Sequence, residues 1–275
     1  MFLEKYLRYT KQLLLDLFDF VIRVIKKKNY LPPRSFRDSV GGHKDFEAIG
    51  IEFLNYFRKF CNLKPDEKIL DVGCGCGRLA IPLTKYLNRG GSYEGFDIIS
   101  KQIGWCKKNI SSSYPNFHFE IANVFNKRFN PKGKIKASEY TFPYKDKSFD
   151  FIFLTSVFTH MLPQDMENYL SEIARVLKKD GRCFITFFLL NNESLKLINF
   201  KKALYLDFKY CFKNYRIVNK KIPEGAIAYD EKFIRKLYYK YRLHIKEPIF
   251  YGSWCGRGNF LSYQDIIISS KNPKI

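Results

Sequence analysis

The sequence predicts an α/β fold whose framework is a doubly wound, mostly parallel sheet. Between residues 68 and 190, short apolar segments typical of strands alternate with segments typical of helices, and this alternation indicates parallel strands joined by helical crossovers. A glycine-rich turn, DVGCGCGR, follows the first of these strands. The chain has 275 residues, 46% of them hydrophobic and 17% aromatic, so it can bury a large core and does not have the composition of a disordered protein.

An amphipathic helical arm is expected at residues 2–28. Its polar side chains recur every three or four residues and leave one broad apolar face, and the segment ends in Lys26, Lys27 and Lys28. The leading interpretation is a helix packed on the main domain. The alternatives are a helix that lies on an anionic membrane surface and a helix bound to a partner chain.

The arm is separated from the main domain by helix-breaking residues. Pro32 and Pro33 end the first helix, and the glycine turn SVGGHKDF leads into the next one. We therefore expect an arm with a glycine turn at residues 1–45 and a main domain at residues 46–275. The strands expected in the main domain are residues 68–73, 91–98, 117–124, 149–158, 181–190, 244–252 and 263–271, and the helices are residues 46–62, 78–87, 100–110, 163–178 and 231–242.

The net charge of +21 is unusually high. Residues 178–247 hold 17 basic and 7 acidic side chains, and residues 127–149 hold seven basic and two acidic ones. Such an excess is typical of proteins that bind nucleic acid, anionic membranes or acidic substrates. The alternative is a lysine-rich composition produced by coding bias, with the lysines merely solvated, and both interpretations stay open.

The cysteines and the apolar runs indicate the compartment. The seven cysteines are scattered, without a C-x-x-C pair or a Cys/His cluster at zinc spacing, so we expect reduced thiols and no metal site. The run LLLDLFDFVIRVI is broken by Asp16, Asp19 and Arg23, which argues against a signal peptide or a membrane-spanning helix. A cytoplasmic protein is expected, which the arm could bring to the membrane periphery.

The spacing of the glycine turn distinguishes three kinds of nucleotide site. A dinucleotide fingerprint requires glycine at position 78, where this chain has Arg78. A phosphate-binding P-loop requires Lys-Ser or Lys-Thr after the loop, and this chain has neither there. The remaining pattern is Asp71 followed by Gly73, Gly75 and Gly77, which lets the backbone lie against a ligand without Cβ atoms in the way.

This pattern resembles the first motif of the class I S-adenosylmethionine-dependent methyltransferases, an acidic residue and then G-x-G-x-G after the first strand. The resemblance extends from about residue 50 to residue 190 and returns at the last two strands. It implies a seven-stranded Rossmann-like sheet, S-adenosylmethionine as the cofactor, and methyl transfer to a small molecule.

The resemblance also implies a set of cofactor-binding residues. Asp97 ends the second strand, where a carboxylate can accept hydrogen bonds from ribose hydroxyls. Asn123, where the family usually has Asp, still offers a carbonyl oxygen to the adenine amine, and the backbone N–H of Val124 would reach a ring nitrogen. The expected cofactor-binding residues are Asp71, Gly73, Cys74, Gly75, Gly77, Arg78, Asp97, Ile98, Asn123, Val124 and Thr155.

Methyl transfer to a hydroxyl needs a general base near the methyl group. His160, in SVFTHML, follows the fourth strand, and an unperturbed imidazole titrates near neutral pH. The alternative is a histidine that only forms part of the wall. His43, in VGGHKDF, is the rival candidate, because the N-terminal segment of such enzymes tends to fold over the active site.

Residues 191–228 occupy the position where the family inserts its acceptor-binding cover. The aromatic residues of this segment, which could clamp a ring-bearing acceptor or pack in a core, are Phe200, Tyr205, Phe208, Tyr210, Phe212 and Tyr215. Ser156 is a further substrate-binding candidate at the end of the fourth strand. Trp254 and Arg257, in GSWCGRGNF, are two more, because Arg257 could reach a carboxylate or phosphate on the acceptor.

The expected function is methyl transfer to a hydroxyl of a small molecule or of a sugar-containing, glycan-type acceptor. Methylation of base amines is disfavoured, because TSVF follows the fourth strand in place of an N-P-P-Y motif. The alternatives are an RNA methyltransferase that uses the basic surface and a non-catalytic nucleotide-binding protein. The sequence leaves the oligomeric state open.

Overall fold

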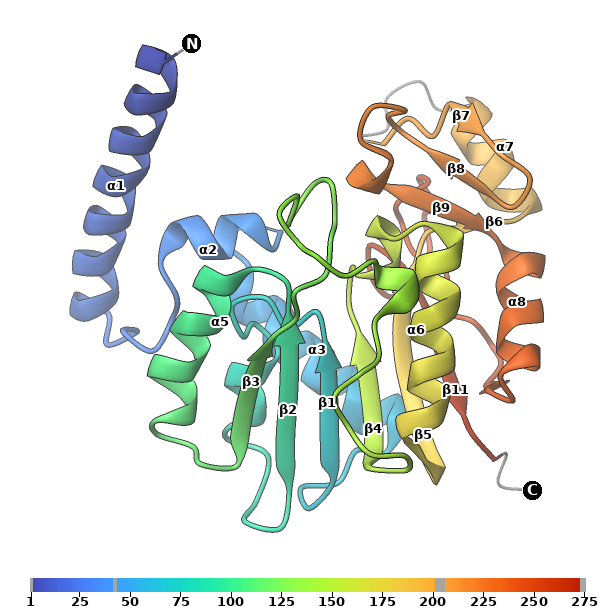
Figure 1. Cartoon of the computed structure of the whole chain (residues 1–275), viewed down its shortest axis with the longest axis horizontal. Coiled ribbons are helices and arrows are strands. Elements are labelled where there is room, and N and C mark those ends of the chain that lie inside the picture. The colour runs from blue at the N-terminus through green and yellow to red at the C-terminus, as the bar shows by residue number, and fades with distance from the viewer. Residues whose placement is uncertain (1, 42–43, 201–205, 273–275) are drawn as a thin grey trace.

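The computed structural model describes residues 2–41, 44–200 and 206–272, and its framework is a seven-stranded sheet (Figure 1). The strand order is β10-β11-β5-β4-β1-β2-β3. The strands β1 to β5 pair in parallel, whereas β11 is antiparallel to β5 and to β10. These strands are β1 (Lys68–Val72), β2 (Ser92–Asp97), β3 (Phe117–Ile121), β4 (Phe149–Leu154), β5 (Leu177–Phe187), β10 (His244–Ile245) and β11 (Asp265–Ser270). The predicted α/β class and mostly parallel seven-stranded sheet are confirmed.

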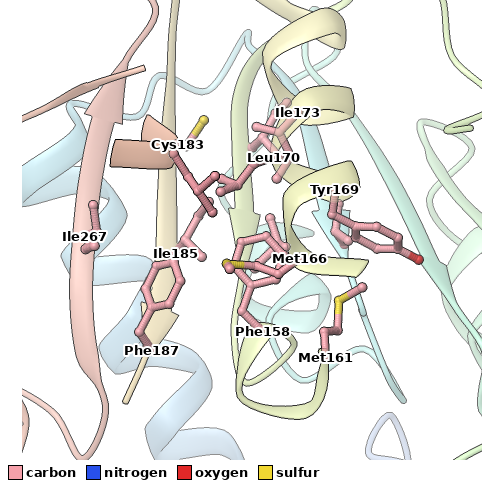
Figure 2. Close-up of a cluster of buried hydrophobic side chains, with 14 of the residues drawn as sticks. Phe158, Met161, Met166, Tyr169, Leu170, Ile173, Cys183, Ile185, Phe187 and Ile267 are labelled. Carbon is pink, nitrogen blue, oxygen red and sulfur yellow. The ribbon is translucent and has the colours of Figure 1, made fainter. Parts of the chain in front are cut away.

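Helices cover both faces of this sheet, because its central strands are apolar on both sides. On one face, the ring of Phe57 from α3 (Phe46–Cys61) lies 5.0 Å from the rings of both Phe151 and Phe184. On the other face, α6 (Pro163–Val176) packs its Leu170 and neighbouring apolar side chains against β5 (Figure 2). Three further helices of the main domain are α4 (Ala80–Leu83), α5 (Ser100–Cys106) and α8 (Glu231–Lys240).

Several expected strands are shorter than predicted, and two of them differ most. The strand expected at residues 244–252 ends at Ile245, since Pro248 has no N–H to donate to a sheet. The strand expected at residues 149–158 ends at Leu154, and a 3-10 helix at Phe158–His160 follows it. This early end turns the chain across the carboxyl edge of the sheet, where ligands bind in open α/β folds.

The segment after β5 forms a second, four-stranded sheet, in the order β6-β9-β8-β7. Its elements are β6 (Leu189–Leu190), α7 (Asn192–Phe200), β7 (Tyr210–Cys211), β8 (Tyr215–Ile217) and β9 (Ile227–Asp230). The strand expected at residues 181–190 is therefore divided between two sheets. The side chain of Asp265 accepts the N–H of Leu189 at 2.6 Å and so fixes the point of division.

The arm is a long helix that stands apart from the body, α1 (Phe2–Ile25), followed by a short helix, α2 (Arg34–Ser39) (Figure 1). The leading interpretation of the arm is a helix packed on the main domain. The structure differs from it, because α1 contacts α2 with its polar face and leaves its apolar face exposed. Among the helices in the described part of the chain, none is long and apolar enough to cross a membrane.

Candidate functional site

A cavity of about 670 Å³ opens at the carboxyl ends of the parallel strands. Its walls come from the turns after β1 and β2, from the segments after β3 and β4, and from residues 38–41 of the arm. Its size lies within the range of small-molecule sites. The glycine turn forms one part of the wall, and His160 lies in another.

The glycine turn brings backbone, rather than side chains, to the cavity. Gly73 has a φ of +82°, and a Cβ added there would lie 2.4 Å from the Val157 side chain. The N–H of Gly75 donates to Asp97 at 2.8 Å. Cys74 and Arg78 also line the cavity, whereas Gly77 does not; a Cβ at Gly77 would lie 2.8 Å from Ile110. Gly77 therefore allows close packing of the turn on the helix behind it.

Asp97 holds the glycine turn and still has capacity for a ligand. Its two carboxylate oxygens accept the N–H groups of Gly75 at 2.8 Å and Ile99 at 2.9 Å. Burial raises the pKa of Asp97, and the backbone N–H groups act in the opposite direction. Each oxygen has a second lone pair, so a pair of ribose hydroxyls can still be bound. Ile98 lines the cavity beside it.

Three buried polar atoms around the turn fit a bound cofactor. Within the described chain, Asp71 Oδ1, Gln102 Oε1 and Arg78 Nε have no hydrogen-bond partner. Buried polar groups are normally paired, so these atoms indicate a ligand with both donors and acceptors. Asp71 is 1% exposed and accepts the Tyr93 hydroxyl at 2.6 Å through its other oxygen, and burial raises its pKa to about 8. The Asp71 and Gln102 oxygens fit the ammonium and hydroxyl groups of S-adenosylmethionine, and the Arg78 N–H fits its carboxylate.

The arm closes the cavity over the glycine turn. Arg78 donates a hydrogen bond to the carbonyl oxygen of Val40, and Gln102 Nε2 donates to Ser39 Oγ at 2.7 Å. Gly75 also lies close to the arm, because a Cβ added there would lie 3.1 Å from the Val40 side chain. His43, the rival base in this segment, lies outside the described residues.

The segments after β3 and β4 supply the next walls. Val124 and Thr155 line the cavity, but Asn123 does not. Asn123 is exposed, and its side-chain oxygen accepts the N–H of Lys134 at 3.3 Å. Ser156 also lines the cavity, with its hydroxyl donating to Gln264 at 3.0 Å. The structure thus brings together most of the predicted cofactor residues, without Asn123 and Gly77.

His160 lies where the segment after β4 meets the second sheet. Its Nδ1 is 2.8 Å from the carbonyl oxygen of Glu224, and a carbonyl only accepts, so Nδ1 carries the proton and Nε2 has the lone pair of a neutral ring. Burial lowers the pKa of His160 to about 4, and the nearby Arg128 guanidinium acts in the same direction. The ring packs edge-on against Phe129, with centroids 5.1 Å apart. His160 is therefore neutral at pH 7 with an unprotonated Nε2, and the same burial makes this nitrogen a weaker base than a solvated imidazole.

Two further residues at this end were not anticipated from the sequence. Glu224 is 8% exposed and lines the cavity, and its Oε2 has no hydrogen-bond partner among the described residues. Arg128 also lines the cavity and donates to the carbonyl oxygen of Gly225. No motif marks these residues, because they are 96 positions apart in the sequence and only the fold brings both to the cavity.

Trp254 and Arg257 require a correction, because the structure does not bring them to the cavity. Trp254 Nε1 donates to Asp265 at 2.7 Å, and Arg257 donates to the same carboxylate at 3.2 Å. Both are buried and connect the second sheet to β11. The aromatic residues expected to clamp an acceptor do not line the cavity either; Phe208, for example, is buried against Trp254. Tyr205 lies outside the described residues.

Known proteins resemble this chain in sequence and in fold. The family model for the methyltransferase domain matches residues 63–241. The ubiquinone/menaquinone biosynthesis C-methyltransferase UbiE of Wigglesworthia glossinidia brevipalpis is 32% identical over 154 residues, which are 55% of this chain and 54% of that protein. A 2-phytyl-1,4-naphtoquinone methyltransferase of Nostoc is 26% identical over 172 residues, which are 62% of this chain and 63% of that protein.

The solved structures agree on the fold. A SAM-dependent methyltransferase from Aquifex aeolicus superposes with a TM-score of 0.51 at 16% identity, over 88% of this chain and all of that one. The chain spans 54 to 63% of the length of the curated relatives named above. Since the family model covers well over half of the chain, this protein belongs to the methyltransferase domain family, and the predicted enzyme class and S-adenosylmethionine cofactor are confirmed at the level of that family.

Proposed function

We propose that this protein methylates a small, ring-bearing acceptor that carries a hydroxyl group, with His160 as the general base. The observation that carries this proposal is the buried, neutral His160, whose Nδ1 is held by a carbonyl oxygen and whose Nε2 has the lone pair that a hydroxyl proton requires. Bound S-adenosylmethionine supplies an electrophilic methyl carbon on a sulfonium.

The side chains around His160 favour an apolar ring over a sugar. Phe129, Met161 and Leu162 line the cavity there, and the charged lining residues of this end include Arg128, Lys136, Asp165 and Glu224. A sugar acceptor requires polar partners on most of its edges, whereas an apolar wall with a few polar groups is typical of sites for flat, largely apolar ligands. Arg128 can stabilise the negative charge that develops on the acceptor oxygen.

The chain's own residues would carry the proton step. His160 Nε2 accepts the proton of the acceptor hydroxyl, and the hydrogen bond to the Glu224 carbonyl keeps the ring oriented. The walls align the acceptor with the methyl carbon; such alignment can supply about 7 to 11 kcal/mol in favourable cases.

A second candidate differs only in the atom that receives the methyl group. Deprotonation of a ring hydroxyl also makes the adjacent ring carbon nucleophilic, and the relative from Wigglesworthia glossinidia brevipalpis is a C-methyltransferase of ubiquinone/menaquinone biosynthesis. Transfer to the ring carbon of a quinol is therefore supported by this relative. The same base serves both candidates.

Turnover assays with labelled S-adenosylmethionine would test the proposal. The acceptor panel should include a catechol, a naphthoquinol, a free sugar and an RNA, and mass spectrometry would locate the new methyl group on oxygen or carbon. Methylation of the sugar alone would contradict the proposal. Methylation of RNA, with a steep loss of binding at high salt, would support the alternative that the basic surface suggests. Cofactor binding without transfer to any acceptor would favour a non-catalytic protein.

A further inference from the structure

The orientation of α1 on the body is the reverse of that of an ordinary surface helix. Its polar side chains face inward. Asp16 accepts the N–H and the hydroxyl of Ser35 at 2.8 and 2.6 Å, and Asp19 accepts hydrogen bonds from Arg23 at 2.7 Å and from Arg37. The contacts with Ser35 and Arg37 attach the helix to α2 by polar bonds that leave its apolar face uncovered.

The apolar face of α1 points to solvent. Each of its large apolar side chains named here is between 48 and 75% exposed: Tyr6, Leu7, Leu13, Leu14, Leu17, Phe18, Phe20, Val21, Val24 and Ile25. A continuous apolar surface of this kind marks an interaction site in a folded protein. Figure 1 shows that α1 stands at the side of the molecule and extends beyond the carboxyl edge of the sheet.

The charges on this segment define what can cover the face. The acidic residues between positions 6 and 28 are Asp16 and Asp19, and both are engaged by α2. Lys11, Lys26 and Lys27 are exposed. The outward charge of this part of the helix is therefore positive, on a chain whose net charge is +21. A second copy would bring these lysines together, whereas an anionic bilayer offers acyl chains to the apolar face and phosphates to the lysines.

We propose that α1 docks this protein on an anionic lipid bilayer, with its apolar face buried at the boundary between headgroups and acyl chains. The polar contacts of α1 with α2 connect the docked helix to the site, because residues 38–41, at the end of α2 and directly after it, line the cavity. This second step rests on the proposed function: docking would hold the cavity at the surface where an apolar, ring-bearing acceptor partitions.

Vesicle flotation of the full chain would test the docking. The vesicles are phosphatidylcholine alone and phosphatidylcholine with phosphatidylglycerol, and we expect binding to the second kind only, weakened by salt. Leu14→Glu with Leu17→Glu should weaken binding at least about a hundredfold, because two leucines leave the apolar phase. Lys26→Ala with Lys27→Ala should weaken it roughly thirtyfold, since each lysine near an anionic surface contributes about 1 kcal/mol.

A matched control comes from α8. Tyr239 is 87% exposed there, so Tyr239→Glu also replaces an exposed apolar side chain with a charge and should leave vesicle binding unchanged. Equal binding of the wild type and the Leu14/Leu17 variant, or no binding at all, would overturn the proposal. A lipid-free dimer that dissociates in the same variant would assign the face to a second copy instead.

The two proposals fail separately. Cofactor affinity and turnover of a water-soluble acceptor, measured without vesicles, report on the site alone. If vesicle binding is lost in the α1 variant while both of these stay at wild-type values, docking is supported and the variant is folded. If vesicles bind but no acceptor is methylated, docking stands and the proposed function falls.

Discussion

The two ends of the cavity are built in different ways. The glycine-turn end consists of consecutive turns after β1 and β2, in which backbone N–H groups bind the Asp97 carboxylate. The His160 end is assembled from the segment after β4, from residues 126–129 and from Glu224, which lies between β8 and β9 of the second sheet. The first end is a local property of the sequence, whereas the second depends on the whole topology.

This difference separates what each end does. A rigid turn held by backbone hydrogen bonds is suited to a cofactor that never changes. The other end is formed by side chains that meet across the fold, and these can vary with the acceptor. Substitutions at the first end should therefore weaken cofactor binding, and substitutions at the second should lower turnover while cofactor affinity stays the same.

The largest effect is expected at His160. His160→Ala should lower kcat by about 10² to 10⁴ on a hydroxyl-bearing acceptor, because the proton acceptor is lost, while calorimetry should show unchanged affinity for S-adenosylmethionine. The control is His118→Ala, since His118 is an exposed histidine of β3 away from the cavity. Full turnover in His160→Ala would remove it as the base, and a loss of cofactor affinity would break the division between the two ends.

Gly73 should give the next largest effect. In Gly73→Ala the new Cβ would meet the Val157 side chain at 2.4 Å, with a φ of +82° that disfavours alanine. We expect roughly 2 kcal/mol of strain, which lowers thermal stability if the turn keeps its shape, and weaker cofactor binding in calorimetry if the turn moves to relieve the strain. Val157→Ala in the same chain should recover part of the loss, and no recovery would mean that backbone strain alone is responsible.

Asp97→Ala should weaken S-adenosylmethionine binding by more than about tenfold, because one carboxylate both holds the glycine turn and offers acceptors to ribose hydroxyls. Asp66→Ala is the matched control, since Asp66 is exposed in the turn before β1. An unchanged dissociation constant for Asp97→Ala would exclude it from the site.

The smallest effect that we expect is the change of kcat with pH near neutrality. Burial lowers the pKa of His160 to about 4, so the neutral, proton-accepting ring predominates above that pH and is lost as the pH falls through it. We expect kcat to stay nearly constant between about pH 5 and pH 7 as far as His160 is concerned, and to fall about tenfold per unit below pH 4. A profile that instead bends near pH 6.5 would indicate an unperturbed histidine.

Most residues of the glycine-turn end could be predicted from the sequence. Asp71, Gly73, Gly75 and Asp97 follow a spacing that the fold places at one edge of the sheet, so the motif predicts their positions. The motif does not predict the position of Asn123, because β3 ends at Ile121 and Asn123 lies exposed beyond the end of the strand. Trp254 and Arg257 could not be placed, since nothing in the sequence reveals that the buried Asp265 binds both.

The helices α1 and α3 show the same limit of prediction from sequence. In sequence, α1 and α3 are both amphipathic, but Phe57 of α3 is 1% exposed and Phe18 of α1 is 65% exposed. The periodicity predicts a helix with an apolar face, and it does not predict which face meets the body. That choice depends on individual polar partners, here Ser35 and Arg37.

Asp71 has a consequence for the cofactor-free protein. With a pKa raised to about 8, its carboxyl is protonated at pH 7, whereas the unfolded chain ionises near 3.8. The unfolded state therefore holds fewer protons over this interval, and stability falls as the pH rises from about 4 to about 8. A cationic cofactor beside the carboxyl would favour its charged form, so binding should release a proton. The protein would then depend most on its cofactor for thermal stability in mildly alkaline solution.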